Sequence, residues 1–104
     1  MPAPCFVDVH SHVVPSGDDG AVTVEEGIEL CRLAAGSGTR VLFATPHVHA
    51  PSDSFPWSAA RERLFEASFP AVRAGAAEVG LELRRGFELF PSEVLERDVE
   101  PFRL

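Results

Sequence analysis

Hydrophobic and polar positions along the first half of the chain follow two different periodicities. Residues 5–12, with the sequence CFVDVHSH, are rich in apolar and β-branched residues and are bounded by Pro4 and by the turn sequence PSGDDG. This pattern predicts a short strand. Apolar residues then recur at helical spacing over residues 24–35, with Ile28 and Cys31 among them, which predicts an amphipathic helix.

The boundaries of this helix can also be predicted. Thr23 and Glu26 fit the sequence pattern of a capping box, so we expect the helix to begin at Val24. The sequence GSG at residues 36–38 predicts its end. The next apolar run, RVLFAT at residues 40–45, is nearly free of polar residues, which is typical of a strand buried on both faces of a parallel sheet.

The second half of the chain continues the same alternation. Residues 58–79 have helical spacing, and Pro70 within them predicts a kink or a division into two helices. Residues 81–89 alternate partly and predict a third strand, and residues 91–99 predict a short helix. The order strand, helix, strand, helix, strand, helix predicts an α/β fold built from right-handed βαβ units around a parallel sheet.

Composition and charge limit the cellular compartments and the binding partners that we expect for this chain. The net charge is −7 and all nine basic residues are arginines, which argues against nucleic acid as a partner. Arg61 and Arg63 are expected to cover the exposed surface of their helix. The N-terminal residues contain no basic region or long apolar run, so we expect no signal peptide, no membrane insertion and a cytoplasmic protein. Cys5 and Cys31 are expected to be buried thiols rather than a disulfide.

Histidines and carboxylates gather where the predicted strands end. His10 and His12 are two residues apart on the first strand, so their side chains leave the same face. Asp8 shares that face and is a candidate acceptor for a ring N–H of one of these histidines. Taken alone, the H-x-H pattern fits a pair of surface histidines equally well.

The other predicted strands bring further ligands to the same edge. His47 and His49 follow the second strand, Glu88 lies near the end of the third, and Asp18 and Asp19 follow the first. The carboxyl ends of parallel strands share one rim, where sites are usually built. Imidazole and carboxylate are ligands of Zn²⁺, Mn²⁺ and Fe²⁺, and a carboxylate such as Glu88 can bridge two ions.

The segment DVHSHVVPSGDDGAVTVEEGIELCRLAAGSGTRVLFATPH resembles the opening of a PHP (polymerase and histidinol phosphatase) domain. More narrowly, it is similar to the bacterial manganese-dependent protein-tyrosine phosphatases of capsule and exopolysaccharide biosynthesis. The shared features are D-x-H-x-H, D-D-G-A, the T-x-E-E helix start and A-T-P-H. The D-D-G sequence favours this branch over histidinol phosphatases and polymerase-associated PHP domains. The resemblance extends to about Glu88.

The resemblance implies a role for several of these residues. The implied metal ligands are His10, His12, His47 and Glu88. Asp19 would be an acid beside a metal ion or the leaving group. Asp18 is better explained as a turn residue, because aspartate before glycine favours tight turns. His49 has no counterpart in the motif and is interpreted as exposed or facing the substrate.

The resemblance also implies a distorted (β/α) barrel that holds two or three divalent ions, with Mn²⁺ favoured over Zn²⁺ or Fe²⁺. The implied activity is hydrolysis of phosphotyrosine in a protein, such as a bacterial tyrosine kinase, by metal-activated water. Such a barrel needs about 250 residues, whereas this chain has 104. We therefore expect one partial domain, residues 1–104, without the family's later ligands and phosphate-binding arginines.

Alternative functions remain open at this point. One is a degenerate PHP fragment that binds metal without catalysis, and another is a PHP phosphatase acting on a small-molecule phosphate monoester. An amidohydrolase-like enzyme also begins with H-x-H, but D-D-G and T-P-H fit it poorly. A partial barrel would leave a sheet edge and apolar surface uncovered, so poor solubility or a homo-oligomer is expected.

Overall fold

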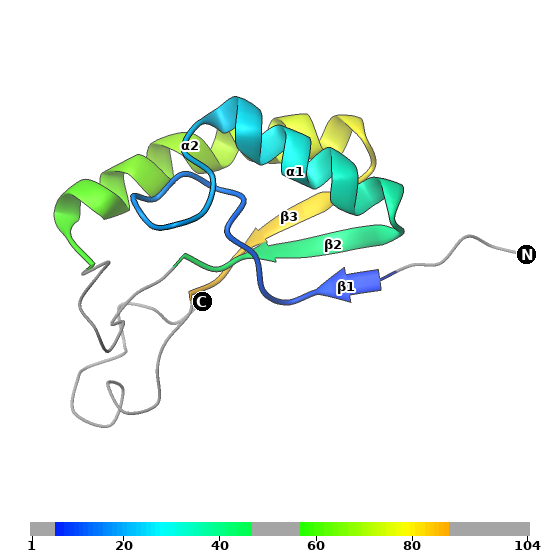
Figure 1. The fold of residues 1–104 in the computed structure, drawn as a ribbon, viewed down its shortest axis with the longest axis horizontal. Coiled ribbons are helices and arrows are strands. Elements are labelled where there is room, and N and C mark those ends of the chain that lie inside the picture. Colours follow the sequence, from blue (N-terminus) through cyan, green and yellow to red (C-terminus); the bar gives the residue numbers. More distant parts are fainter. Residues whose placement is uncertain (1–5, 47–56, 88–104) are drawn as a thin grey trace, which may run out of the picture.

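The computed structural model describes residues 6–46 and 57–87 of the chain. Within these residues, three strands and two helices alternate in the order βαβαβ. The strands form one sheet in the order β1-β2-β3 with both pairs parallel, and both helices cover the same face of it (Figure 1). The predicted α/β class with a parallel sheet is therefore confirmed. The predicted helix at residues 91–99 and Cys5 lie outside the described residues.

The central strand β2 (Thr39–Ala44) was predicted within one residue at each end. Its Leu42 and Ala44 side chains are buried in the core, and the intervening Phe43 is only half-buried. Alternate side chains of a strand point to opposite faces. The expectation of full burial on both faces therefore holds only for the face that the helices cover. The third strand, β3 (Glu82–Arg85), pairs with β2 and is shorter than predicted.

The first strand, β1 (Phe6–Asp8), is much shorter than the predicted run to His12. Its end has a local cause, because the Asp8 carboxylate accepts a hydrogen bond from the His10 backbone N–H at 3.0 Å. A side chain that binds the backbone two residues on favours a turn over continued pairing. The prediction that His10 and His12 lie within the strand is therefore wrong, and both follow its end.

Helix α1 (Val24–Gly36) confirms the predicted start and end. The Thr23 hydroxyl accepts from the Glu26 N–H, and the Glu26 carboxylate accepts from the Thr23 N–H, which completes the capping box. Cys31 is fully buried on the inner face of this helix. Burial raises the pKa of the Cys31 thiol to about 11, which agrees with the expected buried thiol and makes it a poor nucleophile.

Helix α2 (Ala59–Glu78) is one continuous helix, not the two helices that Pro70 allowed. Pro70 lies on the exposed side of the helix. The backbone hydrogen bond that proline removes would have used the Glu66 carbonyl, and Glu66 is also exposed, so water can satisfy that carbonyl. The helix therefore continues because its inner face is undisturbed. The buried residues on that face are Arg61, Phe65, Ser68, Phe69, Val72 and Ala76.

The core lies between the sheet and the two helices. Its largest buried side chains include Phe65 of α2, Leu42 of β2 and Leu81, which precedes β3. Val13 and Val14 also belong to this core, although they follow β1 and lie in no helix or strand. Part of the loop after β1 therefore contributes to the core together with the regular elements. Neither described helix is long and apolar enough to span a bilayer.

We predict that Gly27→Ala destabilises the protein and that Gly36→Ala does not. A Cβ at Gly27 would lie 2.1 Å from the Val13 carbonyl oxygen, whereas a Cβ at Gly36 would meet nothing within 4 Å. Relieving the first clash must move backbone, so we expect a loss of about 1–3 kcal/mol. Gly36→Ala should be neutral or stabilising by less than about 1 kcal/mol. Urea denaturation of both variants checks this, and equal effects would contradict the close packing of α1 on the loop.

Candidate metal centre

The carboxyl ends of the three strands lie at one edge of the sheet, as expected for parallel strands (Figure 1). Residues 9–23 form the β1–α1 loop, which begins at this edge. The loop turns back on itself, and the Ala21 N–H donates to the His12 carbonyl at 2.9 Å. Its polar side chains are therefore brought together beside the strand ends.

Ser11 attaches the start of this loop to the end of β2. Its hydroxyl donates to the Phe43 carbonyl at 2.7 Å, and its N–H donates to the Thr45 hydroxyl at 3.0 Å. The Thr45 N–H in turn donates to the Ser11 carbonyl at 2.7 Å. Ser11 lies between His10 and His12, so these bonds hold the backbone that carries both imidazoles.

The rings of His10 and His12 face one another edge to face, with centroids 5.1 Å apart. Their Nε2 atoms are 3.1 Å apart. That separation fits a hydrogen bond between the rings, and it also fits one coordination sphere. Two nitrogens bound about 2.1 Å from a common ion lie roughly 3.0–3.4 Å apart. The two Nε2 atoms are thus placed as a pair of ligands would be.

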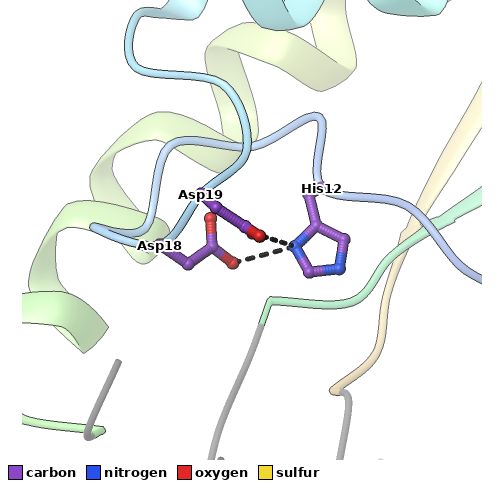
Figure 2. Close-up of side chains that lie close together, drawn as sticks. All are labelled: His12, Asp18 and Asp19. Carbon is purple, nitrogen blue, oxygen red and sulfur yellow. Dashed lines mark hydrogen bonds and ion pairs between the residues drawn. The ribbon is translucent and has the colours of Figure 1, made fainter. Parts of the chain in front are cut away.

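The other ring nitrogen of His12 meets two carboxylates, as Figure 2 shows. His12 Nδ1 is 3.0 Å from Asp18 Oδ2 and 3.6 Å from Asp19 Oδ1. The Asp18 side chain is fully buried, whereas 62% of the Asp19 side chain is exposed. Ligand atoms of these three residues all lie within 4.8 Å of one another. The arrangement offers a buried acceptor for the ring N–H and an accessible carboxylate beside it.

Two glycines allow the loop to take this shape. Gly17 has a φ of +78°, a conformation that other residues rarely adopt. Gly20 lies so close to the loop's first turn that a Cβ there would be 2.3 Å from the His12 carbonyl oxygen. The Asp18 carboxylate also accepts the Gly20 N–H at 2.9 Å. Asp18 therefore shapes the turn as well as contacting His12.

The predicted site residues fall into two groups. His10, His12, Asp18 and Asp19 lie together at the strand ends. Asp8 binds the His10 backbone N–H, and the carboxylate beside the His12 ring is Asp18. The predicted turn role of Asp18 is therefore accompanied by a contact to imidazole that the sequence did not indicate. The remaining predicted residues, which lie outside the described part of the chain, are His47, His49 and Glu88.

Arg61 is the residue near the site that the sequence interpretation missed. It was expected to cover a helix surface, but it is 8% exposed and its Nε donates to the Ser16 carbonyl at 2.6 Å. The burial of Arg61 could have been predicted from the sequence, because Arg61 lies four and eight residues before Phe65 and Phe69. That spacing places it on the buried face of α2.

Comparison with known proteins agrees with the resemblance that the sequence motifs indicate. The family profile described as capsular polysaccharide synthesis, CpsB/CapC, matches residues 6–102. Tyrosine-protein phosphatase YwqE of Bacillus subtilis (strain 168) is 44% identical over 42 residues, which is 40% of this chain and 16% of that protein. Tyrosine-protein phosphatase CpsB of Streptococcus agalactiae (serotype V) is 38% identical over 42 residues, 40% of this chain and 17% of that protein. The matched segment is therefore a small part of these relatives.

We predict that Ser11→Ala lowers stability and shifts both imidazoles. The substitution removes the hydroxyl that donates to the Phe43 carbonyl at 2.7 Å. We expect a loss of about 0.5–1.5 kcal/mol in the free energy of unfolding. Urea denaturation measures that loss, and the NMR signals of His10 and His12 report the movement. Ser37→Ala is the matched control, because Ser37 is exposed at the end of α1 and should change stability by less than about 0.5 kcal/mol.

Proposed function

Because the chain belongs to the CpsB/CapC family of capsular polysaccharide synthesis, we propose that it serves in metal-dependent hydrolysis of phosphotyrosine in proteins. One observation carries the proposal. The Nε2 atoms of His10 and His12 converge to 3.1 Å while the other nitrogen of His12 is backed by Asp18. The names of the relatives, tyrosine-protein phosphatases, support this choice of reaction.

The donor set fits a divalent transition metal. Imidazole nitrogens and carboxylate oxygens suit Mn²⁺, Zn²⁺ and Fe²⁺, and a metal-bound histidine usually donates its other N–H to a carboxylate, a backbone carbonyl or water. The contact from His12 Nδ1 to Asp18 has that form. We propose Mn²⁺ as the ion, held by His10 and His12 through Nε2. His47 and Glu88, which follow β2 and β3 along the chain, would complete a centre of two or three ions.

Each described residue has a distinct task in this proposal. Bound ions would supply Lewis acidity, which offsets charge on the phosphoryl oxygens and lowers the pKa of water towards about 7. Asp18 accepts the His12 Nδ1–H and so keeps Nε2 directed at His10. Asp19 is exposed and lies beside His12. As a general acid, it would donate a proton to the tyrosine oxygen as the phosphorus–oxygen bond breaks.

The acidic net charge of the chain disfavours an anionic substrate unless cations are bound at the site. The chain has a net charge of −7, and Asp18 and Asp19 stand at the proposed site. Two divalent ions there would invert the local potential and attract phosphate. The charge balance therefore supports a metal-dependent reaction over one that relies on this chain's basic residues.

We further propose that the three strands begin a larger (β/α) barrel. Among the described residues, β1 and β3 each pair with β2 alone. Val7 of β1 is 58% exposed, although strands of parallel sheets are usually covered on both faces. Further strands of a barrel, or a second copy in a homo-oligomer, would cover such surface. The proposed substrate is a cytoplasmic protein that carries phosphotyrosine, such as a bacterial tyrosine kinase.

We predict Mn²⁺-dependent hydrolysis of a phosphotyrosyl peptide and of p-nitrophenyl phosphate by the purified chain. Turnover should disappear with a chelator and return with Mn²⁺. His10→Ala should lower Mn²⁺ affinity by at least about 100-fold, since loss of a residue that merely supports a ligand typically costs 10- to 100-fold. Phosphate release and metal content by mass spectrometry are the two measurements.

Two controls make this experiment decisive. Arg32→Ala removes an exposed residue paired with Glu29 on α1 and should leave both readouts unchanged. A phosphoseryl peptide tests the preference for phosphotyrosine. Bound Mn²⁺ without turnover would favour a non-catalytic metal-binding protein. Hydrolysis of small phosphate monoesters but not of the phosphotyrosyl peptide would favour a small-molecule phosphatase. Turnover that survives chelation would contradict the proposal.

A further inference from the structure

Arg61 joins the second helix to the loop that carries the candidate metal centre. Its Nε donates to the Ser16 carbonyl at 2.6 Å, and its Nη2 lies 3.4 Å from the Ser16 hydroxyl. Ser16 is fully buried. The loop and the helix are 45 residues apart along the chain at this contact, so the guanidinium fixes one relative to the other.

The same guanidinium reaches the buried carboxylate of the site. Nη2 of Arg61 lies 3.9 Å from Asp18 Oδ2, the same oxygen that is 3.0 Å from His12 Nδ1. The side chain of Arg61 is 10% exposed and that of Asp18 is fully buried. Charges interact more strongly where water is excluded. Arg61, Asp18 and His12 therefore form a continuous polar line from α2 to the imidazole.

Burial of this arginine is unfavourable unless its surroundings compensate. Burial lowers the pKa of the Arg61 guanidinium, and the nearby charge of Asp18 opposes that shift. The guanidinium also lies 5.1 Å from the centre of the Trp57 ring, a distance that allows a favourable cation–π contact. A methionine or leucine would fill the same space on the core side of α2 without this cost. The retained charge therefore calls for an explanation beyond packing.

Gly17 shows how closely the arginine and the loop fit together. A Cβ at Gly17 would lie 3.3 Å from Arg61 Cγ, which is tighter than ordinary contact. The aliphatic stem of Arg61 thus covers the turn between Ser16 and Asp18. The stem limits movement of the turn. The guanidinium contacts the Ser16 carbonyl on one side of Gly17 and lies near the Asp18 carboxylate on the other.

We propose that Arg61 is a positioning residue for the metal centre, acting through Asp18 on His12. It keeps Asp18 Oδ2 where it accepts the His12 Nδ1–H, which directs His12 Nε2 towards His10. Arg61 itself would touch neither metal nor substrate. The inference deepens the proposed function and rests on it for the metal, but the effect on the His12 ring is independent of any ion.

The first test is therefore spectroscopic and needs no metal. Proton–nitrogen correlation spectra of the imidazoles should show the Nδ1–H form of His12 in the wild-type chain. In Arg61→Met we expect this form to lose population and the His12 signals to shift. Arg61→Lys, which can still donate to the Ser16 carbonyl, should restore part of the wild-type spectrum. His12 signals that stay unchanged in a folded Arg61→Met would overturn the proposal.

The second test measures coupling by Mn²⁺ titration calorimetry on the full chain. Asp18→Asn should weaken Mn²⁺ binding about 10- to 100-fold and Arg61→Met about tenfold, as expected for residues that support a ligand. If Arg61 acts through Asp18, the double variant should bind within about threefold of Asp18→Asn alone. Losses that simply multiply would mean that Arg61 acts on Mn²⁺ binding independently of Asp18, and would overturn the proposal.

Matched variants separate the possible failures. Arg63→Met, on the exposed side of the same helix, should change neither the His12 spectrum nor Mn²⁺ affinity. Thermal unfolding checks each variant, and if Arg61→Met fails to fold, Arg61→Lys takes its place in the spectroscopic test, where His12 signals identical to the wild type would overturn the proposal. A wild-type chain that shows the Arg61-dependent His12 signal but binds no Mn²⁺ would support the positioning role and contradict the proposed function alone.

Discussion

The β1–α1 loop depends on one fully buried carboxylate, that of Asp18. A carboxylate without access to water must receive hydrogen bonds from the protein that surrounds it. Here the donors come from the Gly20 backbone and the His12 ring, and the Arg61 guanidinium lies 3.9 Å away as a charge partner. They belong to the turn, the candidate ligand and the second helix. Satisfying this one group therefore fixes all three relative to each other.

Close backbone packing at two glycines also supports the shape of the β1–α1 loop. Gly27 lets α1 approach the Val13 carbonyl, and Gly20 lets the loop return onto His12. Ser11 completes the attachment with its bonds to the end of β2. The loop is thus held by a strand and both helices rather than extending into solvent. These attachments favour the proposed metal centre, because ligands that are already oriented lose little freedom when an ion binds.

Local signals predicted the elements well and their interactions less well. The capping box at Thr23 and the apolar run of β2 correctly located α1 and β2, because caps and periodicity act within a few residues. The first strand was predicted too long, since its end is set by the Asp8 side chain and by Ser11 binding a distant strand. Pro70 suggested a division of α2, but its place on the exposed face leaves the buried face intact.

By itself, the sequence determined the parallel α/β arrangement, the resemblance to PHP-type protein-tyrosine phosphatases and the candidate ligands that follow β1. It did so because strand and helix periodicities are local, and because imidazole and carboxylate are recognisable ligand types wherever they occur. Only the tertiary structure decided which carboxylate meets which imidazole. Asp8 lies nearer to His10 and His12 along the chain, yet Asp18 reaches the His12 ring. Arg61 lies 45 residues beyond Ser16, and although its spacing from Phe65 and Phe69 indicates burial, its contacts with the loop are not contained in local spacing along the chain.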